Sequence, residues 1–253
     1  DVCSSDLAGD GFITMLSTIS GTGNIVNNST GYLFLAGNNS FTGALTLNAG
    51  LTQVTGTGQN ALGSASAGTT INEGATLNFR FFGNDEGCDP VTIAEPFTLA
   101  GDGAGNAPYN NLNNYSIGAD CFDGPSREAV DITLSGAISL TADTKVDPTR
   151  SFKITGPLAG NFSIGVAQGQ AGNLVVASSA NTSKTPNGTY QADAVTSTIS
   201  NSSPEEDIDI RYHETIVING VRKIIDVFTG GILKGTGTVG TVSVRNGGKI
   251  AQA

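Results

Sequence analysis

Four copies of one short pattern, apolar–any–apolar–any–glycine, constrain most strongly what this chain can fold into. The copies are Leu33-Phe34-Leu35-Ala36-Gly37, Phe97-Thr98-Leu99-Ala100-Gly101, Ile132-Thr133-Leu134-Ser135-Gly136 and Phe152-Lys153-Ile154-Thr155-Gly156. Alternating apolar residues are typical of a β-strand with one buried face, and a glycine permits the turn that ends it. We therefore expect short strands joined by tight turns.

The composition favours strands and argues against helices. Charged residues occupy 13% of the 253 positions, about half the ~25% of soluble domains, and the 35 glycines are about twice the usual ~7%. Good helix formers are scarce and no segment keeps a 3.6-residue apolar period, which excludes a helical bundle, a coiled coil and a Rossmann-type enzyme. Because 38% of the residues are hydrophobic, the chain can form a core and is not expected to be disordered.

Short strands separated by Gly, Asn, Ser and Thr turns are compatible with a sandwich, a barrel or a solenoid. The absence of long strand-like runs and of aromatic residues at a fixed sandwich spacing favours the solenoid. In a parallel β-solenoid, inward side chains of successive coils stack into apolar ladders, and the corners need small residues. The expected fold class is an all-β parallel β-helix (β-solenoid) with loop insertions.

The two ends of the chain are expected to be cuts in a longer protein. Residues 1–7, DVCSSDL, back-translate to a string that resembles the end of a sequencing adapter, and we interpret them as a translated artefact. Residues 8–253 are then a single solenoid fragment. Within it, residues 18–80 are the most regular part, and residues 130–253 hold further coils.

Two polar stretches interrupt the recurring strand pattern. We interpret residues 82–129 as a loop-rich insertion and residues 178–207 as a polar excursion. After the second stretch, Asn219-Gly220 separates two strand-like runs, and this dipeptide suits the type I′ turn of a hairpin. In a solenoid the same dipeptide also suits a corner between coils, so both interpretations stay open.

Charge and cysteine content limit the partners. Twelve basic and 22 acidic residues give a net charge of −10, which a nucleic-acid backbone repels, so no nucleic-acid partner is expected. Outside residues 1–7, two cysteines remain, Cys88 and Cys121. A disulfide between them would close the 82–129 insertion and suit an exported protein, whereas the alternative is a pair of free buried thiols.

One stretch carries an ordered series of family markers. They are Ile19-Ser20-Gly21-Thr22-Gly23, Leu33-x-Leu35-x-Gly37-x-Asn39-x-Phe41-Thr42-Gly43, Ala61-Leu62-Gly63 and Gly74-Ala75-Thr76-Leu77. The series resembles the autotransporter-associated β-strand repeat of large bacterial surface proteins. The stretch from Gly231 to Ile250 is similar to the region near the end of such passengers, where the family continues with Ala-Pro-Gly and this chain has Gln252 and Ala253.

The resemblance implies a right-handed parallel β-helix that is exported and displayed at the bacterial cell surface, in association with the outer membrane. It implies a structural or adhesive passenger segment with a host-surface or glycan ligand. Its other partner would be the rest of the same polypeptide at both ends, including a C-terminal membrane barrel. No cofactor, metal ion or catalytic activity is expected.

Few residues could carry chemistry. Gly235-x-Gly237-x-x-Gly240 matches the dinucleotide-binding glycine pattern, but a strand-like run follows where that site requires a helix. The single histidine, His213, has Glu214 beside it, and adjacent strand residues face opposite sides, so they form no acid–base pair. No clustered histidines or Cys-x-x-Cys pattern indicates zinc.

The alternative function is a polysaccharide-cleaving β-helix, either a hydrolase or a lyase. A hydrolase needs paired carboxylates across a sugar site, and loops on a rigid scaffold often carry such sites. The densest ionisable group, near Arg127, supplies the catalytic residues of this alternative: Asp120, Asp123, Glu128 and Asp131. Carboxylates at a loop end usually only keep it soluble, so we expect a protein that is not an enzyme.

Overall fold

A computed structural model describes most of the chain. The described residues are 5–7, 9–55, 61–82, 88–105, 115–123, 126–128, 130–147, 151–160, 162, 164–167, 173–176, 195–199, 203–210, 214–227, 231–245 and 247–251. All regular secondary structure in these residues is β-strand, and they contain no helix. The expectation of an all-β protein is confirmed.

The largest sheet has 14 strands and consists of two rows that meet at one strand. The first row is β1 (Ser5–Leu7), β3 (Ile25–Asn27), β5 (Leu45–Leu47), β7 (Thr69–Ile71), β10 (Phe97–Gly101) and β14 (Ile138–Asp147). The second row is β2 (Phe12–Met15), β4 (Tyr32–Leu35), β6 (Gly50–Thr55), β8 (Ala75–Phe82), β11 (Ile117–Asp123) and again β14. Because β14 has ten residues, it belongs to both rows and the sheet curls around it.

Three short strands join the large sheet, and two further sheets complete the fold. The short strands are β12 (Ser126–Glu128), which pairs with β11, and β16 (Leu158–Ala159) and β17 (Ile164–Val166), which both pair with β14. The eight-stranded sheet contains, in order, β25 (Lys249–Ile250), β23 (Ile232–Lys234), β21 (Glu214–Ile218), β19 (Val195–Ile199), β18 (Asn173–Val176), β15 (Ser151–Ile154), β13 (Asp131–Leu134) and β9 (Val91–Ile93). The three-stranded sheet contains β20 (Ser203–Ile210), β22 (Val221–Val227) and β24 (Thr238–Val244).

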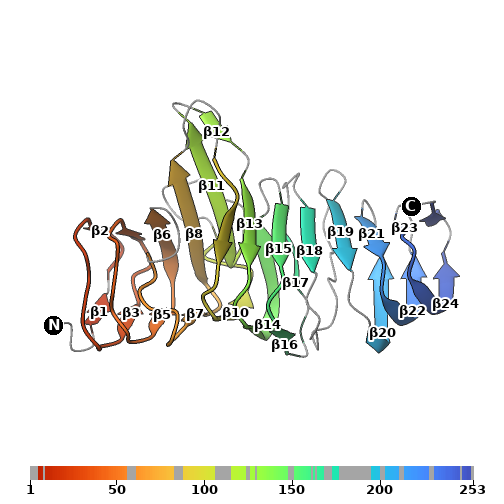
Figure 1. The fold of residues 1–253 in the computed structure, drawn as a ribbon, viewed down its shortest axis with the longest axis horizontal. Coiled ribbons are helices and arrows are strands. Elements are labelled where there is room, and N and C mark those ends of the chain that lie inside the picture. The colour runs from red at the N-terminus through yellow and green to blue at the C-terminus, as the bar shows by residue number, and fades with distance from the viewer. Residues whose placement is uncertain are drawn as a thin grey trace.

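Nearly all strand pairing is parallel, and most paired residues are about 17 to 29 positions apart. The pairs β8 with β11, β9 with β13 and β10 with β14 instead join residues 40 or more positions apart. Among the described strands, the only antiparallel pair is β11 with β12. Ile25 pairs with Leu45, and Asn48 bonds to Asn28 across the same 20-residue step. The strands follow one another along the long axis from the N-terminal end, and β8, β11 and β12 reach above their neighbours (Figure 1). This arrangement is compatible with a parallel β-helix.

The apolar residues of the recurring pattern face the core. In β4, Leu33 and Leu35 are fully buried, and the equivalent pairs in β10, β13 and β15 are at most 2% exposed: Phe97 and Leu99, Ile132 and Leu134, Phe152 and Ile154. Alternation places these side chains on one face of each strand. One continuous apolar cluster extends from Ile25 to Val176. A smaller cluster lies between the last strands, from Ile216 to Leu233.

Glycine and asparagine act at the bends between the two rows. Gly50 has φ +67°, and a Cβ there would lie 2.4 Å from the Ser29 carbonyl oxygen of the preceding bend, so only glycine fits. The Asn48 amide donates to Asn28 at 2.7 Å, and Asn72 donates to Asn48 at 2.6 Å. The high asparagine content therefore also supplies hydrogen bonds that connect successive bends.

Both polar stretches that the sequence singled out contain β-strands. The range 82–129 contains β9, β10, β11 and β12, and the first three pair with neighbouring strands of the rows or of the eight-stranded sheet. Much of the range 178–207 lies outside the described residues, but β19 and the start of β20 fall within it.

The Asn219-Gly220 dipeptide is a corner and not a hairpin turn. β21 pairs in parallel with β19 and β23, whereas β22 pairs in parallel with β20 and β24. The strands on the two sides of the dipeptide thus enter different sheets. The structure also corrects the expectation of short strands only, since β8 and β20 have eight residues each and β14 has ten.

Candidate functional site

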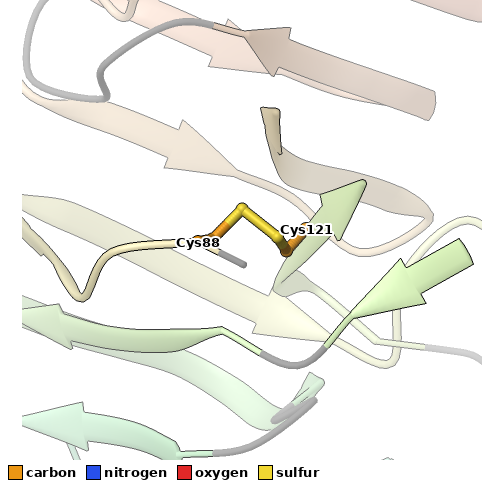
Figure 2. The surroundings of a disulfide bond; sticks show 2 residues. All are labelled: Cys88 and Cys121. Carbon is orange, nitrogen blue, oxygen red and sulfur yellow. A yellow bond between two sulfur atoms is a disulfide. The ribbon is translucent and has the colours of Figure 1, made fainter. Parts of the chain in front are cut away.

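A disulfide bond connects β11 with the segment between β8 and β9. Cys121 lies in β11 and is completely buried, and Cys88 lies in the connection from β8 to β9. Their sulfur atoms are 2.02 Å apart and their Cα atoms 5.9 Å apart (Figure 2). The two cysteines that the sequence singled out are therefore joined, and Cys121 stands opposite Phe81 of β8 and Glu128 of β12 in the strand register.

A network of polar side chains crosses the outer face of the second row. We call Tyr32, Gln53, Asn78, Arg80 and Tyr115 the outer polar network. Its strand residues alternate with the inward-facing Leu33, Val54, Leu77 and Phe79, and so point away from the apolar core. Gln53, Asn78 and Tyr115 are nevertheless at most 1% exposed. This outer face is thus covered, and its polar groups need internal partners.

Hydrogen bonds connect the network from strand to strand. The Tyr32 hydroxyl donates to Gln53 Oε1, and Gln53 Nε2 donates to Asn78 Oδ1 at 3.0 Å. Asn78 Nδ2 in turn donates to the Tyr115 hydroxyl at 2.8 Å, and Arg80 Nη1 donates to Gln53 Oε1 at 3.1 Å. Because both ends of the Gln53 and Asn78 amides are used, the network fixes the relative register of β4, β6 and β8.

A glycine makes room for the last member of the network. A Cβ at Gly118 in β11 would lie 2.6 Å from the Tyr115 ring and 2.7 Å from Cβ of Asp147. Gly118 also pairs with Asn78 in the register of β11 with β8. The missing side chain at Gly118 therefore lets the Tyr115 ring lie over β11 and bring its hydroxyl to Asn78.

Asp120 lies beside the charged end of this network. It is 2% exposed and stands opposite Arg80 in the register of β11 with β8. Burial raises the pKa of the Tyr32 hydroxyl above its usual value of 10.0, the nearby Arg80 opposes this increase, and Asp120 adds to it. Tyr32 therefore stays neutral at physiological pH and remains a donor to Gln53.

Aromatic rings border the network at its N-terminal side. The ring of Phe12 stacks on Tyr32 with a centroid distance of 4.4 Å and an interplanar angle of 14°. The Tyr32 and Phe34 centroids are 6.2 Å apart. Phe12 is 58% exposed, so the outer face opens to solvent at this edge of the sheet.

The carboxylates of the enzymatic alternative are distributed over two sheets. Asp120 and Asp123 lie in β11, and Glu128 lies in β12, where its backbone pairs with Cys121. Asp131 is in β13, in the eight-stranded sheet. The described part of the structure therefore places three of the four residues on one hairpin and the fourth in another sheet.

The histidine, the glycine pattern and the candidate metal ligands indicate no further site among the described residues. His213 lies outside the described residues, and Glu214 begins β21. The glycine pattern from Gly235 to Gly240 leads from β23 into β24, so a strand follows it. Among the described residues, no three His, Cys, Asp or Glu side chains form a group that could hold a metal ion.

The outer polar network was not predicted from the sequence. Alternation alone places Asn78 and Arg80 on one face of β8, between Leu77, Phe79 and Phe81. That signal was present, but the partners on β4 and β6 depend on the strand register, and Tyr115 belongs to no strand. A single sequence contains no direct information on either point.

The fold defines an all-β protein with a large curled parallel sheet. In the part of the chain that the structure describes, no helix is long and apolar enough to cross a membrane. No family model matches the chain, and neither does any curated protein or solved structure.

Proposed function

We propose that the chain is a segment of a right-handed parallel β-helix from an exported bacterial surface protein, in which it acts as a rigid stalk or adhesive surface. The observation that carries this proposal is the parallel pairing of strands about 20 residues apart along the molecule. Such pairing extends a core in one direction, which gives length and stiffness without a large chain.

The residues that resemble the autotransporter-associated repeat have roles in stacking. A Cβ at Gly43 would lie 2.1 Å from the Gly23 carbonyl oxygen, and one at Gly37 would lie 2.6 Å from the Ser17 carbonyl oxygen. Phe41, between them, is 1% exposed. The markers are thus the glycines that let coils approach and an aromatic residue that fills the space inside, which supports a coil of this type.

The disulfide supports the exported location. Disulfides persist in oxidising compartments and are rare in the bacterial cytosol. The bond between Cys88 and Cys121 connects β11 to the segment before β9. We therefore propose that the extension formed by β8, β11 and β12, held by this bond, is the part that presents a recognition surface.

The full, oxidised chain tests this function in two measurements. Small-angle X-ray scattering is expected to give the pair-distance distribution of a rod, and a globular distribution would overturn the proposed stalk. Binding to arrayed glycans and extracellular-matrix proteins is expected for the oxidised chain and lost in the Cys88→Ala/Cys121→Ala variant. Equal binding by the two forms would move recognition away from the extension, contrary to the proposal.

The same preparation tests the enzymatic alternative. Release of reducing or unsaturated sugar ends from plant or bacterial polysaccharides, abolished by Asp120→Asn or Asp123→Asn, would replace the adhesive proposal with a hydrolase or lyase. Proteolysis of intact cells that encode the protein tests the location. Cleavage of the chain without cell lysis is expected, and full protection would contradict surface display.

A further inference from the structure

A cavity formed by the connections between the two rows contains a buried carboxyl group. The cavity measures about 480 Å³ and is lined by Asn38–Ser40, Gly63–Ala65 and Ala94–Glu95. These segments belong to three successive connections from the second row to the first: β4 to β5, β6 to β7, and β8 through β9 to β10. Volumes of this order are typical of small-molecule sites.

Among the described residues that line the cavity, Glu95 alone has an ionisable side chain, and it is 5% exposed. Its Oε1 accepts a hydrogen bond from the Thr69 hydroxyl at 3.0 Å. Its Oε2 has no hydrogen-bond partner among the described residues. One carboxyl oxygen in the wall of the cavity therefore remains available to a ligand.

The surrounding groups do not balance the charge of this carboxylate. Thr69 comes from β7, Asn39 and Ser64 come from the lining connections, and the Glu95 carbonyl faces Gly136 of the next connection. None of these groups titrates, and no charged side chain of the described part affects the Glu95 carboxyl. Burial raises its pKa to about 7, and the Thr69 hydrogen bond lowers it only in part.

The lining selects the ligand by its charge. An anion would add a second negative charge in a place with no cation, which is unfavourable. A divalent metal ion takes about six or more oxygen ligands, and the described residues contain no group of three metal-binding side chains. A primary ammonium needs three acceptors and neutralises the carboxylate in a single contact.

The amide of Asn39 holds the cavity wall and is not available to a ligand. Its Oδ1 accepts from the Ile19 amide at 2.9 Å, and its Nδ2 donates to the Ala61 carbonyl at 2.7 Å. Asn38 and Ser40, on the two sides of it, are exposed at the rim. The wall is thus fixed by bonds between connections, while the rim offers additional oxygen acceptors.

We propose that this cavity binds a primary alkylammonium group, with Glu95 Oε2 as the charged acceptor and side-chain oxygens of the rim as the others. The group could belong to a free small amine or to a lysine side chain of a partner, since both present the same chemistry. The proposal does not depend on the adhesive function, because it uses residues of the stacked connections and none of the β8, β11 and β12 extension.

The experiment is a titration of the full chain, followed by NMR, with n-propylammonium, Nα-acetyl-lysine-N-methylamide and, as neutral analogues, 1-propanol and glucose. At pH 8 we expect saturable binding of one or both amines and none of the neutral compounds. Since the amine binds the ionised carboxyl, affinity at pH 6 is expected to be about tenfold lower. Binding of n-propylammonium alone assigns the site to free amines, and binding of the lysine analogue assigns it to a partner's side chain.

The variant Glu95→Gln is expected to lose amine binding, and Glu73→Gln, which changes an exposed carboxylate, is the matched control. If Glu95→Gln does not fold, the carboxyl ¹³C resonance of Glu95 in the unmodified chain gives the same information. Its titration midpoint is expected to move down by at least one pH unit at saturating amine. Binding of glucose, unchanged affinity in Glu95→Gln, or an unmoved midpoint would overturn the proposal.

Discussion

Replacing Cys88 and Cys121 by alanine removes the covalent tie at the base of the β8, β11 and β12 extension. The two residues are 33 positions apart, and the loop-entropy relation gives about 3.7 kcal/mol of stabilisation at 25 °C for a cross-link of this length. Cys121 is completely buried, so its truncation adds a packing loss of about 1 kcal/mol. We expect a total loss of about 4–5 kcal/mol.

Urea denaturation followed by far-UV circular dichroism measures this loss. Both proteins should carry Cys3→Ala, because that change leaves the Cys88–Cys121 bond in place and prevents exchange with a third thiol. The single variant Cys3→Ala is then the control, and the triple variant is expected to unfold at a lower urea concentration. A free energy of unfolding within about 0.5 kcal/mol of the control would refute the entropic reasoning.

Hydrogen exchange shows where the stability is lost. In a stacked array each unit contacts mainly its neighbours, so a local change has local effects. Amide protection is expected to fall in β8 and β11 and to stay unchanged in β21 and β23, which lie farther along the molecule. Equal loss in all four strands would show that the chain unfolds as one cooperative unit.

Three further predictions concern the cavity, the network and the sheet edge. Since burial raises the pKa of Glu95 from 4.5 to about 7, its ionisation destabilises the fold as pH rises between those values. The shift corresponds to a loss of at most about 3 kcal/mol of unfolding free energy, and we expect about 1–2 kcal/mol because solvent reaches the cavity. The urea midpoints at pH 5 and pH 8 should therefore differ less in Glu95→Gln than in the unmodified chain. An equal difference in the two proteins would contradict this prediction. Tyr115→Phe removes the acceptor of Asn78 Nδ2 and should cost about 1–3 kcal/mol, so a melting temperature equal to that of the unmodified chain would argue against the network. Phe12 in the outermost strand β2 and Leu16 directly after it are 58% and 70% exposed. Phe12→Lys/Leu16→Lys should therefore reduce concentration-dependent association in sedimentation velocity, and a monodisperse unmodified chain would contradict this prediction.

The local strand pattern could be predicted from the sequence because it depends on neighbouring residues. Alternation at Leu33 and Leu35, or at Phe152 and Ile154, predicts which side chains are buried, and all four are. Strand length could not be predicted in the same way. β14 continues through Thr141-Ala142-Asp143-Thr144, where polar residues suggest a turn. The neighbouring strands pair with the residues on both sides of this stretch, Ile138–Leu140 and Thr144–Asp147, and the register with β10 shifts across it.

The polar sites depend on contacts that no local pattern contains. Glu95 stands before Pro96 in a segment whose sequence is typical of an ordinary turn, and its burial follows from the stacking of connections that contain Asn38 and Gly63. The Tyr115–Asn78 bond spans 37 positions and requires the missing side chain at Gly118. Cys88 and Cys121 were accessible to sequence reasoning, since outside residues 1–7 the chain has no other cysteine.

The strand β14 couples the two rows of the large sheet mechanically. Backbone hydrogen bonds between neighbouring strands run along the long axis, so a pull on the two ends stretches them and detaches the end strands first. At β14 the strands β10, β11, β16 and β17 are all bonded to one unbroken segment. Because one strand belongs to both rows at this point, a force that reaches β14 acts on both rows through the same segment, and the two rows cannot separate there independently of each other.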